Sequence, residues 1–131
     1  MNPVVHFEMG YFDPERMKKF YQSTFNWDLE QLGSEMGNYI VAHTTETDKD
    51  GMVKTPGNIN GGFYKKTDDT NTQHPSLVIR VDDLKKHVKI VEAAGGKILG
   101  EPWNIPGTGW YVSFIDTEGN KVSMIQPAPM P

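Results

Sequence analysis

The side chains able to do acid–base or metal chemistry here are histidines and carboxylates, because the 131-residue chain has no cysteine. Without a thiol, the sequence excludes disulfides, thiolate zinc sites, iron–sulfur clusters and a cysteine nucleophile. His6 is the histidine best placed for chemistry, since it falls in an alternating segment, residues 4–9, that predicts a half-buried strand. A neutral imidazole could act as a general base near pH 7, although no acidic partner at a clear spacing is visible to orient it.

The elements that must position these side chains occur twice along the chain. A strand over 4–9 is followed by a helix that Asp13 and Pro14 begin and Asn26 ends, and a second strand over 76–81 is followed by a helix that Asp82 or Asp83 caps. Three further strand patterns follow each helix. They cover 27–32, 39–45 and 60–66 in the first half, and 97–99, 110–116 and 121–126 in the second.

The element order therefore predicts an α+β fold of two tandem βαβββ modules within one domain, 1–131. Module 1 spans 1–66, module 2 spans 76–131, and the very polar segment 67–75 is the predicted linker. Each module has one helix for one sheet, which leaves a second sheet face to cover. We expect the two curved mixed sheets to enclose a shared cavity, which is a natural site for a small molecule.

Charge and hydropathy limit the kinds of partner that can be expected. The net charge is −4 and no basic stripe is visible, so nucleic acid is not an expected partner. The first residues lack a basic segment followed by an apolar one, and no apolar run approaches membrane-spanning length. The expectation is a cytoplasmic protein that does not contact a membrane.

Four segments carry a family resemblance: 4–9, 13–27, 81–98 and 105–126. Their most specific parts are Phe20-Tyr21 in the first helix, the E-A-A-G-G of 92–96, and the D-x-E-G-N turn of 116–120. In this order and spacing the chain resembles the glyoxalase/bleomycin-resistance/extradiol-dioxygenase superfamily, also called vicinal oxygen chelate proteins. The resemblance implies paired βαβββ modules with a cavity between them, and a homodimer. It does not fix the chemistry, because the superfamily includes metal-dependent lyases, dioxygenases and metal-free drug-binding proteins.

The resemblance also implies where catalytic members hold a divalent metal. The equivalent positions here are His6, then Gly61 or Gly62, then Ser76 and Ser123. Glycine offers no ligand atom and serine is a poor ligand, so His6 is the one competent ligand among them. No resident cofactor is therefore expected. The alternative is a metal-dependent lyase resembling lactoylglutathione lyase, or a dioxygenase, with an altered ligand set in which Glu8 and His74 join His6.

Without a metal, the same positions predict a small-molecule-binding protein whose reaction is unassigned, and whether it is an enzyme stays open. His6, Glu8, Ser76 and Ser123 would offer hydrogen bonds on the cavity floor. Arg80 could hold a carboxylate or phosphate, and Trp103 could form an aromatic wall; these six residues are the candidate ligand-binding set. Three of them also have a purely structural interpretation: a solvated strand end for Arg80, core packing for Trp103, and a histidine bonded to nearby serines for His6. An interaction module that has lost its site is a third interpretation.

Overall fold

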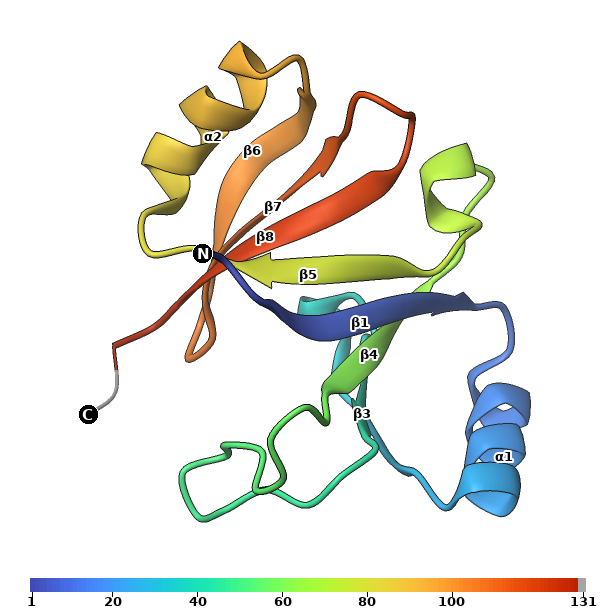
Figure 1. Cartoon of the computed structure of the whole chain (residues 1–131). Coiled ribbons are helices and arrows are strands. Elements are labelled where there is room, and N and C mark those ends of the chain that lie inside the picture. Colours follow the sequence, from blue (N-terminus) through green and yellow to red (C-terminus); the bar gives the residue numbers. More distant parts are fainter. Residues whose placement is uncertain (130–131) are drawn as a thin grey trace. The chain divides into compact units, whose positions relative to one another are not determined.

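The computed structural model describes residues 1–129 and divides the chain into two compact units (Figure 1). The N-terminal unit is His6–Pro75. The C-terminal unit is Met1–Val5 together with the chain from Ser76 onward. Each unit contains one long helix and a mixed four-stranded sheet, so the predicted α+β class and the repeated βαβββ order are confirmed.

The N-terminal unit has the strand order β2-β3-β4-β1. Strands β1 and β4 are parallel, and the other neighbouring pairs are antiparallel. The elements are β1 (Val4–Tyr11), α1 (Pro14–Phe25), β2 (Asp28–Gln31), β3 (Ile40–His43) and β4 (Asn60–Lys65), with short 3-10 helices at Ser34–Met36 and Thr70–Thr72.

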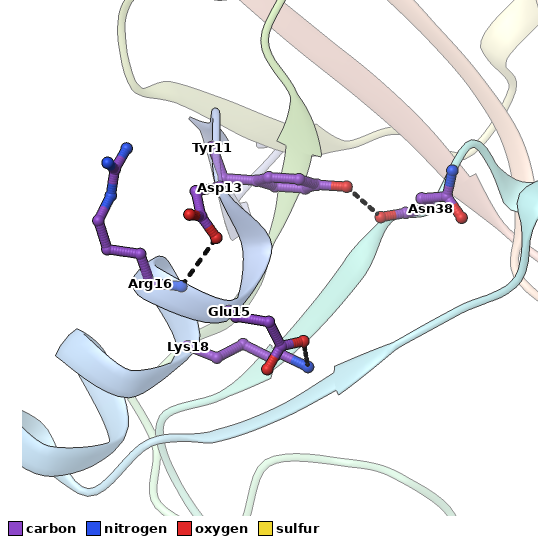
Figure 2. A network of polar contacts seen from close by, with 6 residues as sticks. All are labelled: Tyr11, Asp13, Glu15, Arg16, Lys18 and Asn38. Carbon is purple, nitrogen blue, oxygen red and sulfur yellow. Dashed lines mark hydrogen bonds and ion pairs between the residues drawn. The ribbon is translucent and has the colours of Figure 1, made fainter.

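Helix α1 begins and ends where its capping residues predict. The Asp13 side chain accepts a hydrogen bond from the Arg16 amide at 3.1 Å (Figure 2), and Pro14 occupies the first turn. Asn26 ends the helix in the left-handed conformation, with φ of 58°. The apolar side of α1, including Met17 and Tyr21, packs against one face of the sheet. The buried core there consists of Tyr11, Leu29, Ile40, Ala42 and Phe63.

The C-terminal unit has the strand order β5-β8-β7-β6. Its elements are β5 (Ser76–Arg80), α2 (Leu84–Ala93), β6 (Lys97–Ile105), β7 (Gly109–Ile115) and β8 (Lys121–Pro127). Of the two candidate caps, Asp83 binds the helix, since it accepts from the Lys86 amide at 3.1 Å. The buried core between α2 and its sheet consists of Val81, Leu84, Val112 and Met124.

Strand β6 is longer than the sequence predicts. The sequence predicted a strand over 97–99, but pairing with β7 resumes after an irregularity and continues to Ile105. Trp103 is paired with Tyr111, so it lies in a strand. The reason is a tight turn at Gly107, whose φ of 74° lets the hairpin close late.

Each sheet has one face toward its helix and one away from it. Because strand side chains alternate, Phe7, Met9 and Tyr11 face α1, whereas His6 and Glu8 lie on the opposite face. By the same alternation, Tyr111 and Ser123 lie on the face opposite the α2 core. We call these two surfaces the polar faces. Among residues 1–129, no helix is long and apolar enough to cross a membrane.

Candidate functional site

The polar face of the N-terminal unit gathers His6, Glu8, Tyr39 and Tyr64. The parallel β1–β4 register sets His6 opposite Asn60, Glu8 opposite Gly62 and Gly10 opposite Tyr64. His6, Glu8 and Gly10 follow one another at two-residue spacing along β1, and their partners do so along β4. All three pairs therefore share one face of the sheet. Tyr39 comes directly before β3, whose Val41 is also opposite Gly62. Sheet register thus brings together side chains that lie up to 58 residues apart in sequence, His6 and Tyr64 being the most distant.

A hydrogen-bonded chain links three of these residues. The Tyr39 hydroxyl donates to Glu8 Oε2 at 3.0 Å, and His6 Nε2 lies 3.4 Å from the same hydroxyl oxygen. Glu8 is only 6% exposed. Removing a carboxylate from water is costly unless hydrogen bonds replace its hydration, and the phenol supplies such a bond. Glu8, which strand alternation placed on the same face as His6, is therefore joined to His6 through the Tyr39 hydroxyl.

Burial sets the protonation of this cluster. It lowers the pKa of His6 below its ordinary value, and the nearby Glu8 carboxylate opposes that shift without overcoming it. His6 is therefore neutral at pH 7 and can accept or donate a hydrogen bond. Burial, together with the Glu8 charge, raises the pKa of Tyr64, so its phenol stays protonated.

A tight turn fixes the position of Tyr39. Gly37 and Asn38 both adopt left-handed backbone conformations, with φ of 65° and 57°. The Tyr11 hydroxyl donates to the Asn38 carbonyl at 2.7 Å and ties this turn to β1 (Figure 2). The sequence alone did not single out Tyr39. No local motif marks it, because its role comes from a contact between residues 31 positions apart.

The polar face of the C-terminal unit carries a cluster of hydroxyl groups. Ser123 is fully buried, and its Oγ lies 2.8 Å from both the Tyr111 hydroxyl and the Ser113 Oγ. Ser76 is 6% exposed, and its buried Oγ has no hydrogen-bond partner among residues 1–129. A buried hydroxyl without a partner is uncommon in folded proteins, so Ser76 is a candidate contact for a ligand or a water molecule.

The two remaining candidates lie at the margins of this face. Arg80 is exposed at the end of β5, where its amide donates to the Pro3 carbonyl at 2.9 Å. Trp103 is 49% exposed, and its neighbour across β6 and β7 is Tyr111. Their roles in ligand binding stay predictions.

Sheet register decides which of Gly61 and Gly62 corresponds to Ser123, the position where the resemblance implies a metal ligand in the second module. Glu8 lies two residues after His6, and Val78 lies two residues after Ser76, so Glu8 and Val78 hold equivalent places. Glu8 pairs with Gly62 and Val78 pairs with Ser123, so Gly62 corresponds to Ser123. A Cβ on Gly61 would instead overlap the Phe7 ring on the core side.

The side chains present do not fit a metal site of the expected kind. Within residues 1–129, no group of three or more histidines and carboxylates is placed to hold an ion. The altered ligand set is therefore not assembled. His74 contributes instead its backbone carbonyl, which accepts from the Tyr64 hydroxyl at 3.2 Å.

Two open grooves occur elsewhere on the N-terminal unit. The smaller, about 340 Å³, lies between the end of β1 and α1 and includes Phe12, Arg16 and Phe20. The larger, about 570 Å³, lies at the ends of β2 and β3 and includes Asp28 and His43. Neither His6, Glu8 nor Tyr39 lines them, so a ligand bound in either groove would be distinguishable from one on the polar face.

The chain belongs to the Glyoxalase/Bleomycin resistance protein/Dioxygenase superfamily, whose sequence model matches residues 4–124. The resemblance that the sequence motifs indicated is therefore confirmed.

Among individual relatives, a glyoxylase-like domain-containing protein from Didymella fabae is 32% identical over 111 residues, 82% of this chain and 80% of that protein. A probable chloroplastic lactoylglutathione lyase from Arabidopsis thaliana is 39% identical over 54 residues, 40% of this chain but 15% of that protein.

Solved structures with this fold include methylmalonyl-CoA epimerases. A variant of the Streptomyces coelicolor enzyme in complex with 2-nitronate-propionyl-CoA has a TM-score of 0.70 at 14% identity, and covers 99% of this chain and 97% of its own. A hypothetical protein from Bacillus halodurans has a TM-score of 0.69 at 10% identity, with the same coverage. At these identities the likeness shows the fold alone.

Proposed function

We propose that this protein binds a small organic molecule, and that the polar face of its N-terminal unit, with His6, Glu8 and Tyr39, makes the decisive contacts. The observation that carries the proposal is the burial of the Glu8 carboxylate, which is 6% exposed and hydrogen-bonded to Tyr39. The reaction, if there is one, is unassigned.

The cluster of His6, Glu8 and Tyr39 is not explained by the stability of the fold. Buried ionised groups rarely add net stability, and well-packed apolar residues in their place are often neutral or stabilising. The apolar core of the unit lies on the other face of the sheet and does not use His6 or Glu8. A cluster that the core does not need is therefore better explained by recognition of a polar ligand.

The cluster offers both hydrogen-bond acceptors and donors. Neutral His6 can present either function, and the Glu8 carboxylate is an acceptor. These groups suit an uncharged ligand that carries hydroxyl, carbonyl or amide groups.

The test is a ligand screen by thermal shift, followed by amide chemical-shift mapping of each hit. We expect a hit to raise the melting temperature of the wild-type protein and to shift the amides around His6, Glu8 and Tyr39. Glu8→Gln should weaken binding at least tenfold. Glu30→Gln is the matched control, because Glu30 is an exposed glutamate on β2. Hits that map to either groove, or equal binding by both variants, would contradict the proposal. The absence of any hit in a broad screen would favour an interaction module.

A metal-dependent lyase is the second candidate, favoured by the partial match to the plant lactoylglutathione lyase. It predicts stoichiometric nickel, zinc, iron or manganese in the purified protein, and formation of lactoylglutathione that is lost in His6→Ala. The donor set argues against it, since a glycine stands at one expected ligand position and buried serines at two others. A wild-type protein that gains no thermal stability from any divalent ion would eliminate this candidate.

The absence of a resident cofactor, the homodimer and the cytoplasmic location are also proposals. Metal analysis of the protein as purified tests the first. Light scattering coupled to size-exclusion chromatography tests the second, with twice the 14.8 kDa chain mass as the expected result. Fractionation of the source cells tests the third.

A further inference from the structure

Tyr39 and Tyr111 hold the same place in the two units. Val41 is opposite Gly62, and Tyr39 lies two residues before Val41. Ser113 is opposite Ser123, and Tyr111 lies two residues before Ser113. Each tyrosine is therefore diagonal to the last-strand position of its own unit and on the same face of the sheet, within reach of a long side chain.

Both side chains extend to that last-strand position. In the C-terminal unit, the Tyr111 hydroxyl lies 2.8 Å from the Ser123 Oγ. In the N-terminal unit, a Cβ built on Gly62 would overlap the Tyr39 hydroxyl and ring. The Tyr39 phenol thus fills the space that a side chain at position 62 would need, and position 62 corresponds to a metal-ligand position of the superfamily.

We infer that Tyr39 closes the metal-ligand position of the N-terminal unit, and that its hydroxyl takes the place of a cation between His6 and Glu8. This inference rests on the proposed metal-free function. A phenol can replace a cation here because it has one donor and one acceptor function. The donor reaches Glu8 at 3.0 Å, and the acceptor lies 3.4 Å from His6 Nε2.

The consequence is that a metal site cannot be restored by one substitution. A carboxylate at position 62 would stand beside His6 and Glu8, but the Tyr39 ring occupies its path. Removing Tyr39 alone opens the space and leaves two ligands. Both changes together would provide three nitrogen and oxygen ligands on one sheet face, a donor set suited to zinc or nickel.

The first test measures packing alone and needs no ligand. Gly62→Ala should lower the melting temperature of the wild-type protein by about 5 °C or more, because the added methyl displaces the Tyr39 ring. In a Tyr39→Ala background, Gly62→Ala should lower the melting temperature by less than half as much. A Tyr64→Ala background is the control, since it removes a tyrosine from the same unit without freeing Gly62. Equal costs in the Tyr39→Ala and Tyr64→Ala backgrounds would overturn the inference, whatever the ligand screen shows.

The second test uses zinc chloride or nickel chloride alone, with calorimetry on the full chain. We expect Tyr39→Ala/Gly62→Glu to bind the ion at least tenfold more tightly than the wild-type protein or Gly62→Glu. Tyr64→Ala/Gly62→Glu should gain nothing. Tight stoichiometric binding by the wild-type protein would overturn the inference, as would equal binding by Gly62→Glu and the Tyr39 double variant. A folded double variant without a gain would also overturn it. If the double variant does not fold, the packing test decides.

Discussion

The bond between Tyr39 and Glu8 gives a direct test of how the polar face is held together. Tyr39→Phe removes the hydroxyl and keeps the ring that covers Gly62. The lost bond joins a phenol to a buried carboxylate at 3.0 Å, and hydrogen bonds to charged groups contribute about 1.5–3 kcal/mol. The 3.4 Å contact with His6 is long and should add little.

We therefore expect Tyr39→Phe to lower the free energy of unfolding by about 1.5–3 kcal/mol, measured by urea denaturation at pH 7. Tyr64→Phe is the matched control, because the Tyr64 hydroxyl donates to the uncharged backbone carbonyls of Thr72 and His74. Its loss should cost about 0.5–1.5 kcal/mol. The reasoning fails if Tyr39→Phe costs less than about 0.5 kcal/mol, or no more than the control.

Three further predictions test the electrostatics and the fold. The pKa of His6 is lower in the folded protein than the ordinary value of 6.5. Below pH 6.5 the unfolded chain therefore binds more protons at His6 than the folded protein does, so the free energy of unfolding falls as the pH falls. Urea titrations of wild-type and His6→Gln proteins from pH 7.5 to 5 should show a shallower decline in the variant; parallel curves would contradict this. Gly109→Ala should strongly destabilise the protein in thermal melts, because φ is 133° there and an added Cβ would overlap the Gln126 carbonyl oxygen. A melting temperature within about 2 °C of the wild type would refute that reason. Leu84→Ala should lower the free energy of unfolding by about 2–5 kcal/mol in urea denaturation, since Leu84 is fully buried in the first turn of α2. A loss under about 1 kcal/mol would mean that the site collapses around the smaller side chain.

The elements of this fold could be predicted because their signals are local. The cap residues Asp13 and Asn26 and the alternation around His6 each act over a few positions, and these short-range preferences do not depend on the rest of the chain. The repeated order of elements and the family could be predicted in the same way. The end of β6 could not, because the late turn at Gly107 lets pairing resume beyond the irregularity in the hairpin.

The candidate site was predicted in part. His6 and Glu8 were identified from one strand, since alternation alone places them on one face. The link between them was missed, because Tyr39 reaches Glu8 from 31 residues away and no short motif encodes that approach. Whether Gly61 or Gly62 faces this cluster depends on a shift of one residue in register, and such a shift exchanges the two faces of a strand.

The sequence by itself determined which chemistry is available: no thiol, few histidines, and glycine and serine at the positions where the family resemblance implies metal ligands. Only the tertiary structure decided what stands there instead. Strand pairing aligned Glu8 with Gly62, and the turn at Asn38 placed the Tyr39 phenol over that glycine. The physical reason is that residue types limit which bonds can form, whereas register and turn geometry decide which of them do form.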